Sequence, residues 1–179
     1  KGFLVESPSS VRDLNQRLVL DQRKDNQRWR SPPWTPMANP GAFPFIQVPT
    51  VEGMETQVMV GDLPDWYWTL ELPLVFAEYF CLDGVRARDV QNLLQKDGHN
   101  VEFPSDAAGL GMKVPIMGWN WAVFLAQMTI EDLLSHHVAE FTSNRRLAYK
   151  VVLPQVGVED PLVHWEYIDD IGVMSLVPV

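Results

Sequence analysis

Two adjacent carboxylates, Asp169 and Asp170, separate two apolar runs in the stretch HWEYIDDIGVM, residues 164–174. A plain hairpin turn is one explanation, because Asp tolerates turn geometry and its side chain bonds nearby backbone groups. A third carboxylate, Asp62, closes the predicted strand 57–60 and lies 107 residues before Asp169. If this strand and the hairpin are antiparallel neighbours in one sheet, the three carboxylates come together.

Carboxylates that cluster in this way repel one another unless they are hydrated, protonated or neutralised by cations. Mg²⁺ is the natural cation for such an oxygen-rich site, because it keeps several waters and binds one or two carboxylates together with substrate phosphates. Two such ions about 3.5–4 Å apart can clamp the attacking and leaving oxygens of a phosphoryl displacement. The residues therefore favour a nucleotidyl-transfer site with two Mg²⁺ ions, and a metal pair at a hairpin tip is compatible with the turn.

The elements that must position these carboxylates include both strands and helices. Hydrophobic periodicity and turn residues predict strands at 17–23, 57–60 and 112–116, helices at 86–98 and 118–137, and a terminal hairpin over 163–177. Strands and helices do not alternate strictly, so an α+β fold with an antiparallel sheet and helices packed on one face is expected.

The helix 118–137 is the strongest of these predictions. Its large apolar residues recur at helical spacing and predict one buried stripe, formed by Trp121, Phe124, Leu125 and Met128. Glu131 and Asp132 are expected to face solvent, and His136 and His137 to lie at the surface near the helix end, where His suits the helix dipole.

A proline-rich segment, residues 30–49, is expected to be an extended connector, because Pro disfavours both helix and strand pairing. Its apolar side chains should be buried against another element; they are Trp34, Phe43, Phe45 and Ile46.

Composition predicts a globular chain with a real core, since 46% of its 179 residues are hydrophobic. No apolar run is long enough to span a bilayer, so no membrane partner is expected. The single cysteine, Cys81, excludes an internal disulfide and a thiolate zinc site and is predicted to fill the core. The chain starts at Lys1 and shows no signal peptide, so we expect a piece of a longer intracellular protein, nuclear or cytoplasmic.

Charge is distributed unevenly along the chain. The net charge of −9 argues against a protein that mainly grips phosphates. The first thirty residues nevertheless hold seven basic and four acidic residues, whereas the remainder holds seven and nineteen. Two interpretations of the basic segment stay open, an ordinary solvated face or contacts to template phosphates with stacking on Trp29. The basic residues that these interpretations concern are Arg23, Lys24, Arg28 and Arg30.

Four motifs in order resemble the polymerase domain of a reverse transcriptase, an RNA-directed DNA polymerase, of a divergent retroelement or retrotransposon group. They are RLVLDQRKDN (17–26), GDLPDWYW (61–68), IMGWNWAVFLAQ (116–127) and the Tyr-x-Asp-Asp signature at 167–170. The sequence departs from the family pattern at Ile116, where a proline is usual, and no lysine-rich tip precedes Arg17.

The resemblance implies a role for each matching residue. Asp62, Asp169 and Asp170 would hold two Mg²⁺ ions, with Asp62 and Asp169 as the more direct ligands. Tyr67 would be the steric gate that selects deoxynucleotides, although a core aromatic would look the same in the sequence. The remaining residues would contact the incoming dNTP. Arg17 would neutralise the charge of its triphosphate, and the backbone of Leu63, Asp65 and Trp66 would face that triphosphate. Gly118 would let the backbone approach the nucleotide closely, and Gln127 would contact it from the helix that follows.

The resemblance also implies an architecture of polymerase fingers and palm without a thumb. The fingers would comprise about 1–55 and 84–115, and the palm about 56–83 and 116–179. Template-primer nucleic acid (RNA or DNA) and dNTP would be the partners, and the thumb would belong to a longer polyprotein. The alternatives are an inactive retroelement relic, or a nucleic-acid-binding module, that retains the fold. A nucleotide cyclase, whose sheet also presents paired carboxylates, is a third, but the segment 17–26 has no place there.

Overall fold

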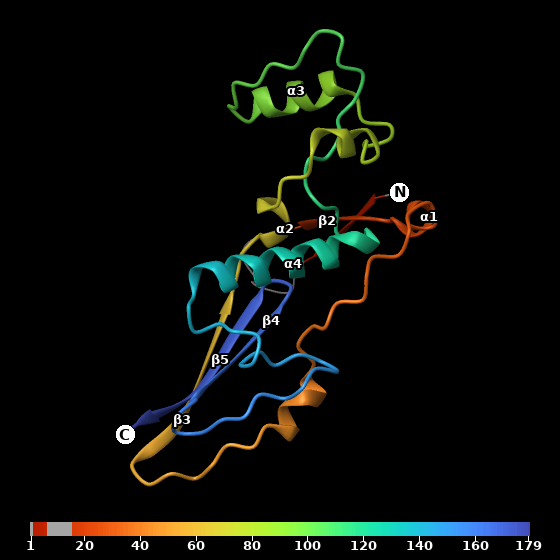
Figure 1. Cartoon of the computed structure of the whole chain (residues 1–179). Coiled ribbons are helices and arrows are strands. Elements are labelled where there is room, and N and C mark those ends of the chain that lie inside the picture. Colours follow the sequence, from red (N-terminus) through yellow and green to blue (C-terminus); the bar gives the residue numbers. More distant parts are fainter. Residues whose placement is uncertain (1, 7–15) are drawn as a thin grey trace. The chain divides into compact units, whose positions relative to one another are not determined.

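The structure is a computed structural model that describes residues 2–6 and 16–179 (Figure 1). Its backbone divides into two compact units. The first unit comprises Lys1–Asp21 and Tyr67–Gly118, and the second comprises Gln22–Trp66 and Trp119–Val179. This division does not test the assignment to fingers and palm, which stays a prediction.

The second unit is built on a three-stranded antiparallel sheet. Its strands are β3 (Met54–Asp62), β4 (Leu162–Tyr167) and β5 (Asp170–Pro178), in the order β3-β5-β4 (Figure 1). The expected terminal hairpin is therefore confirmed, and β3 contains the predicted strand 57–60. A mixed helix and strand structure around an antiparallel sheet confirms the α+β class.

One face of this sheet carries the hydrophobic core. Side chains alternate between the faces of a strand, so Val163 and Trp165 of β4 share a face with their cross-strand partners on β5, Met174 and Gly172. The buried residues of this core are Ala42, Leu147, Val156, Val163 and Leu176.

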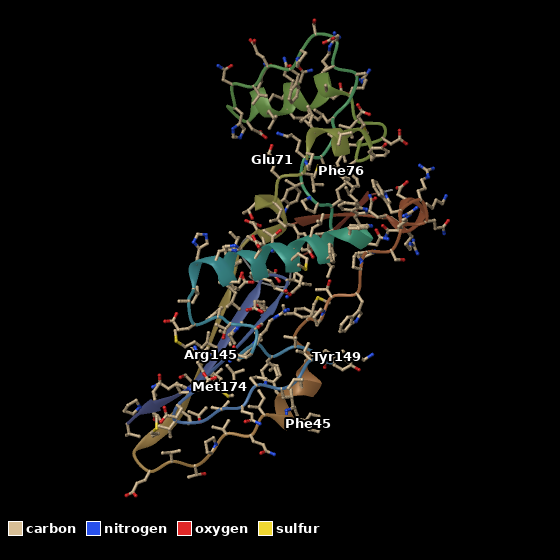
Figure 2. The ribbon with its side chains drawn as sticks, in the orientation of Figure 1. Phe45, Glu71, Phe76, Arg145, Tyr149 and Met174 are labelled. Atoms are coloured by element: carbon tan, nitrogen blue, oxygen red, sulfur yellow. The ribbon has the colours of Figure 1, made fainter. Side chains whose placement is uncertain are left out.

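The proline-rich connector contributes to this core only in part. It contains a 3₁₀ helix, η1 (Pro40–Phe45), and Phe43 and Ile46 pack against the core as predicted. Trp34 and Phe45 are exposed, so the prediction that they are buried was wrong. Figure 2 shows Phe45 on this segment and Met174 in the sheet of the same unit.

The helix α4 (Asn120–His137) matches the predicted helix, but its buried stripe differs from the prediction. Ala122, Ala126 and Ile130 are buried together with Gln127, whereas Met128 is exposed. Small side chains let the helix backbone approach its neighbours closely, so large residues do not identify its packed face. Trp121 instead lies edge-on against Phe124 and donates to the carbonyl of Arg30.

The first unit contains a strand pair, β1 (Gly2–Glu6) with β2 (Gln16–Leu20), the 3₁₀ helix η2 (Leu74–Glu78) and the helix α3 (Ala87–Lys96). The helix predicted at 86–98 is thus confirmed. The strand predicted at 17–23 ends at Leu20, and Arg23–Asn26 form the short helix α1 in the second unit.

Two predictions for the first unit were wrong. Residues 112–116 form no strand; an isolated bridge pairs Cys81 with Gly111, and the Lys113 side chain forms an ion pair with Glu71. Cys81 is exposed and does not fill the core. Its thiol lies near the carbonyls of Ala77 and Glu78, at 3.4 Å from each.

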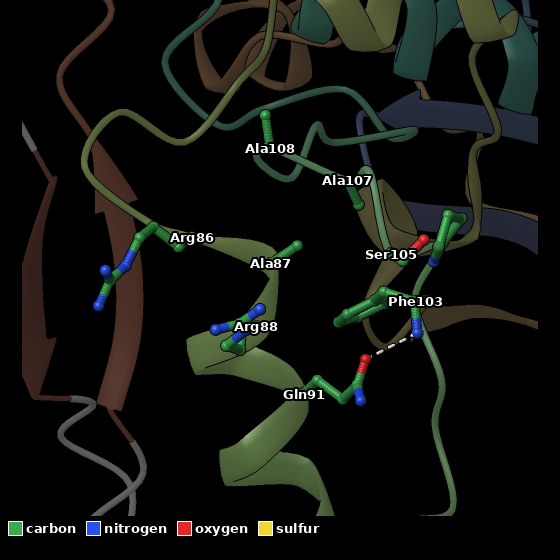
Figure 3. A pocket seen from close by; sticks show the side chains of 9 residues that line it. Arg86, Ala87, Arg88, Gln91, Phe103, Ser105, Ala107 and Ala108 are labelled. Carbon is green, nitrogen blue, oxygen red and sulfur yellow. Dashed lines mark hydrogen bonds between the residues drawn. The ribbon is translucent and has the colours of Figure 1, made fainter.

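An open pocket of about 580 Å³ lies beside the start of α3 (Figure 3). Gln91 accepts a hydrogen bond from the backbone N–H of Phe103 across it, at 2.8 Å. Among the described residues no helix is both long and apolar enough to cross a membrane.

Candidate carboxylate site at the end of the sheet

The second unit brings three aspartates to one end of its sheet. Asp62 is the last residue of β3 and Asp170 the first of β5, and the two are direct cross-strand partners. The backbone N–H of Leu63 donates to the carbonyl of Asp169 at 2.9 Å, which ties the turn to the end of β3. The antiparallel arrangement thus joins residues that are far apart in the sequence, as predicted.

The hairpin turn itself consists of Ile168 and Asp169, because Tyr167 pairs with Asp170. Ile168 has a φ of 62°, in the left-handed region. A β-branched residue is a real outlier there, and such a backbone costs about 1–3 kcal/mol unless its surroundings enforce it. The residue next to the proposed metal ligand is therefore held in a strained conformation.

Gln127, reaching from α4, holds this turn. Its Oε1 accepts a hydrogen bond from the N–H of Ile168 at 2.8 Å, and its Nε2 donates to the carbonyl of Glu166 at 3.2 Å. The same Nε2 donates to a carboxylate oxygen of Glu131 at 2.7 Å. The side chain is fully buried, and its amide groups bond the hairpin backbone and Glu131. A contact of Gln127 with substrate stays a prediction.

A polar network beneath the hairpin supports Gln127. Arg146 forms ion pairs with Glu131 and with Glu166, the latter at 3.1 Å, and also donates to the carbonyl of Pro36 at 2.7 Å. Glu131 is therefore half-buried and paired with Arg146, and the prediction that it faces solvent was wrong. Asp132 and His136 are exposed, as predicted.

His164 completes the network on the same face of β4 as Glu166. Its Nδ1 lies 2.6 Å from a carboxylate oxygen of Glu166, and its Nε2 lies 3.0 Å from the carbonyl of Thr142. Because a carbonyl only accepts, Nε2 carries a proton. The ring of His164 thus connects Glu166 to the backbone at Thr142.

Sequence reasoning missed Arg146, Glu166 and His164. One signal was present: His164 and Glu166 are polar residues two apart in an otherwise apolar strand, so both lie on one face. Two buried polar side chains on one face require partners. The partner itself, Arg146, could not be named from spacing alone.

Electrostatics at the site are unfavourable without a counter-ion. Partial burial and the neighbouring charges of Asp169 and Asp62 raise the pKa of Asp170 above its ordinary value. Beneath the hairpin, burial raises the pKa of Glu131, and the hydrogen bond from Gln127 and the charge of Arg146 oppose it. Like charges directly opposite in a sheet destabilise it.

The three aspartates offer the oxygen donors that Mg²⁺ prefers, and their repulsion is the kind a cation relieves. Among the side chains that the structure describes, however, no three of His, Cys, Asp or Glu converge closely enough to hold a metal ion. The donor set thus fits a divalent cation in its chemistry, while its side chains are not preassembled around one.

The segment after β3 carries the predicted nucleotide contacts. The N–H of Leu63 already bonds Asp169, and Asp65 is exposed with a φ of 57°. The indole of Trp66, at the start of α2 (Trp66–Thr69), donates to the carbonyl of Ala126 at 3.3 Å and so anchors the segment to α4. A nucleotide contact of these residues stays a prediction.

The remaining predicted contacts belong to the first unit. Tyr67 is half-buried and lines a small hollow with Ile116 and Met117, the residues just before Gly118. The φ of Gly118 is 101°, which glycine adopts readily. Arg17 lies in β2, and its side chain is outside the part that the structure describes.

The basic residues predicted to touch template are exposed around α1; they are Arg23, Lys24, Arg28 and Arg30. Arg28 lies 3.6 Å from Asp25 in an exposed ion pair. Trp29 packs edge-on against Trp119 with 5.3 Å between ring centroids, and it is half-buried. Stacking of Trp29 on a base stays a prediction.

Comparison of the chain with protein-family models found no match, and comparison with curated proteins found none at the significance required.

Proposed function

We propose that the chain is the catalytic part of an RNA-directed DNA polymerase, which transfers a nucleotide from dNTP to a primer 3′-hydroxyl on a nucleic-acid template. The observation that carries the proposal is the cross-strand pair of Asp62 and Asp170 with Asp169 in the adjoining turn. The order of the four sequence motifs adds support. The proposal requires the three carboxylates to turn toward shared cations.

The reaction forms a bond between the primer oxygen and the α-phosphorus and breaks the bond to the β-phosphate, so pyrophosphate leaves. Asp62, Asp169 and Asp170 would hold two Mg²⁺ ions, which supply charge stabilisation at the attacking and leaving oxygens. The residues of the chain position the reactants, since such transfers depend on alignment and electrostatics. The tie from Leu63 to Asp169 keeps two of the ligand-bearing segments in register.

Mg²⁺ binding by the 179-residue chain is the first test. Isothermal titration should detect binding in the wild type, and Asp62→Asn or Asp170→Asn should weaken it by about tenfold or more, because a charged ligand is lost. Asp132→Asn is the matched control, since it removes the same charge from an exposed position of the same unit.

Primer extension on an RNA template is the second test, in this chain and in any longer natural protein that contains it. Extension should require Mg²⁺ and disappear in Asp169→Asn. Equal extension by wild type and Asp169→Asn would refute the polymerase proposal. Mg²⁺ affinity that is the same in all variants would instead support a module that retains the fold without catalysis.

A further inference from the structure

The turn that carries Asp169 is held by a side chain outside the hairpin. Ile168 sits at a φ of 62°, and the backbone groups on either side of Tyr167, the N–H of Ile168 and the carbonyl of Glu166, both bond the amide of Gln127. One side chain therefore spans the point where the strand ends and the strained turn begins. Loss of these bonds would leave Ile168 with a steric penalty and an unpaired, partly buried donor.

The orientation of this amide is fixed by its surroundings. The N–H of Ile168 can only donate and the Glu131 carboxylate only accepts, so both demand the same placement of Oε1 and Nε2. Arg146 holds Glu131 on one side and Glu166 on the other. The amide is thus preorganised by an ion-pair network rather than by packing alone.

We propose that Gln127 is the positioning residue of the carboxylate site: it holds Ile168 in its strained conformation and thereby sets where Asp169 stands beside Asp62 and Asp170. This inference rests on the proposed function only in taking those carboxylates as ligands of Mg²⁺. Asp169 follows Ile168 directly and its carbonyl accepts from Leu63, so a relaxed turn would displace it from the end of β3.

A double-mutant cycle tests this role. Gln127→Leu removes both amide groups at similar volume, and Ile168→Gly removes the steric cost of positive φ. In the wild-type background, Gln127→Leu should weaken Mg²⁺ affinity about tenfold and speed hydrogen exchange of the residue 168 amide by a similar factor. In the Ile168→Gly background the same substitution should change Mg²⁺ affinity by less than about twofold, so the two effects should not be additive, as expected for residues in direct contact.

Two further variants keep the test decisive. Gln127→Asn retains a neutral amide but withdraws it by one methylene, so it should reproduce the loss with less risk to folding. Gln95→Leu is the matched control on α3, where an exposed side-chain amide donates to the carbonyl of Val101. It should leave both Mg²⁺ affinity and exchange at residue 168 unchanged.

The outcomes separate positioning from simple structural support. A lower melting temperature for Gln127→Leu, with Mg²⁺ affinity and exchange at residue 168 unchanged, would overturn the proposal. Equal effects of Gln127→Leu in the wild-type and Ile168→Gly backgrounds would overturn it as well. If no variant binds Mg²⁺ while exchange at residue 168 still depends on Gln127 and Ile168 together, Gln127 still holds the turn, and the proposed function is wrong.

Discussion

At the residue scale, the end of the sheet combines two structural features that are unfavourable for folding. Asp62 faces Asp170 across the strand pair, and Ile168 adopts a positive φ in the adjoining turn. Native sequences depart from local preference mainly at functional sites. The adjacency of charge repulsion and backbone strain is therefore consistent with a site whose carboxylates are kept for binding a cation.

The ionisation of Asp170 yields a prediction about pH. Its pKa is raised by partial burial and by the charges of Asp169 and Asp62. A carboxyl with a raised folded pKa contributes stability that is present at low pH and is lost as pH rises through that pKa. Asp62→Asn should therefore lower the pKa of Asp170 toward its ordinary value, and it should raise the melting temperature at neutral pH in the absence of Mg²⁺.

NMR titration of the Asp170 carboxyl and thermal unfolding across the acid range measure both effects. Asp132→Asn is the control, because that exposed carboxylate lies on α4 and contacts His136 rather than the site. The gain in melting temperature should vanish once the pH falls below the folded pKa. A gain that persists at low pH would show that repulsion between carboxylates is not its cause.

At the element scale, the sequence predicted strands and helices better than their packed faces. The hairpin and α4 were predictable because turn residues and helical spacing are local signals. The buried face of α4 was not, because Ala122 and Ala126 give no contrast in hydrophobicity, yet they allow close approach. Burial of Glu131 could not be foreseen, since it depends on Arg146, which only the fold brings near.

For the carboxylate site, the strand pairing was predictable from the sequence, but the local backbone conformation was not. Antiparallel pairing of β3 with the hairpin could be expected, and it places Asp62 opposite Asp170. The strained turn could not be expected, because an Ile at positive φ contradicts local preference. The exposure of Cys81 was missed for a related reason, since the apolar neighbours of a residue in the sequence do not determine its neighbours in space.

The close approach of Gly172 to Trp165 gives a prediction about the sheet. The two residues are cross-strand partners, and a Cβ added to Gly172 would lie 1.9 Å from a ring carbon of Trp165. The ring also packs edge-on against Phe43, with 4.9 Å between centroids. Gly172→Ala should therefore displace the ring and destabilise the second unit by about 1–3 kcal/mol, as overpacking does.

Denaturant unfolding and the near-ultraviolet circular dichroism of tryptophan measure this effect. Gly61→Ala is a matched control in the same sheet, because no heavy atom beyond Gly61 and its two chain neighbours lies within 4 Å of the added Cβ. Alanine at a compatible glycine position is neutral or slightly stabilising. Equal destabilisation by both variants would show that strand glycines in general, rather than the Trp165 ring, set the cost.

At the scale of the whole molecule, the net charge of the chain and the local distribution of its basic residues favour opposite conclusions about nucleic-acid binding. The net charge of −9 disfavours binding to polyanions, yet four exposed basic residues cluster around α1 in the unit that holds the carboxylates. Polyphosphate contacts from a local basic segment can coexist with a negative chain, because screening at physiological salt limits repulsion to about 8 Å. The polymerase proposal requires that this segment contribute to template binding.

Salt dependence of template-primer binding tests that requirement. Replacing Arg23, Lys24, Arg28 and Arg30 with Gln should weaken binding and reduce the slope of log affinity against log salt by about 0.9 for each duplex phosphate that is no longer neutralised. Fluorescence anisotropy with a labelled RNA–DNA hybrid measures both quantities. The control replaces four basic residues of the first unit, Arg86, Arg88, Lys96 and Lys113, and so makes the same change in net charge. If both quadruple variants reduce the slope equally, the segment around α1 has no specific role and total charge alone governs binding.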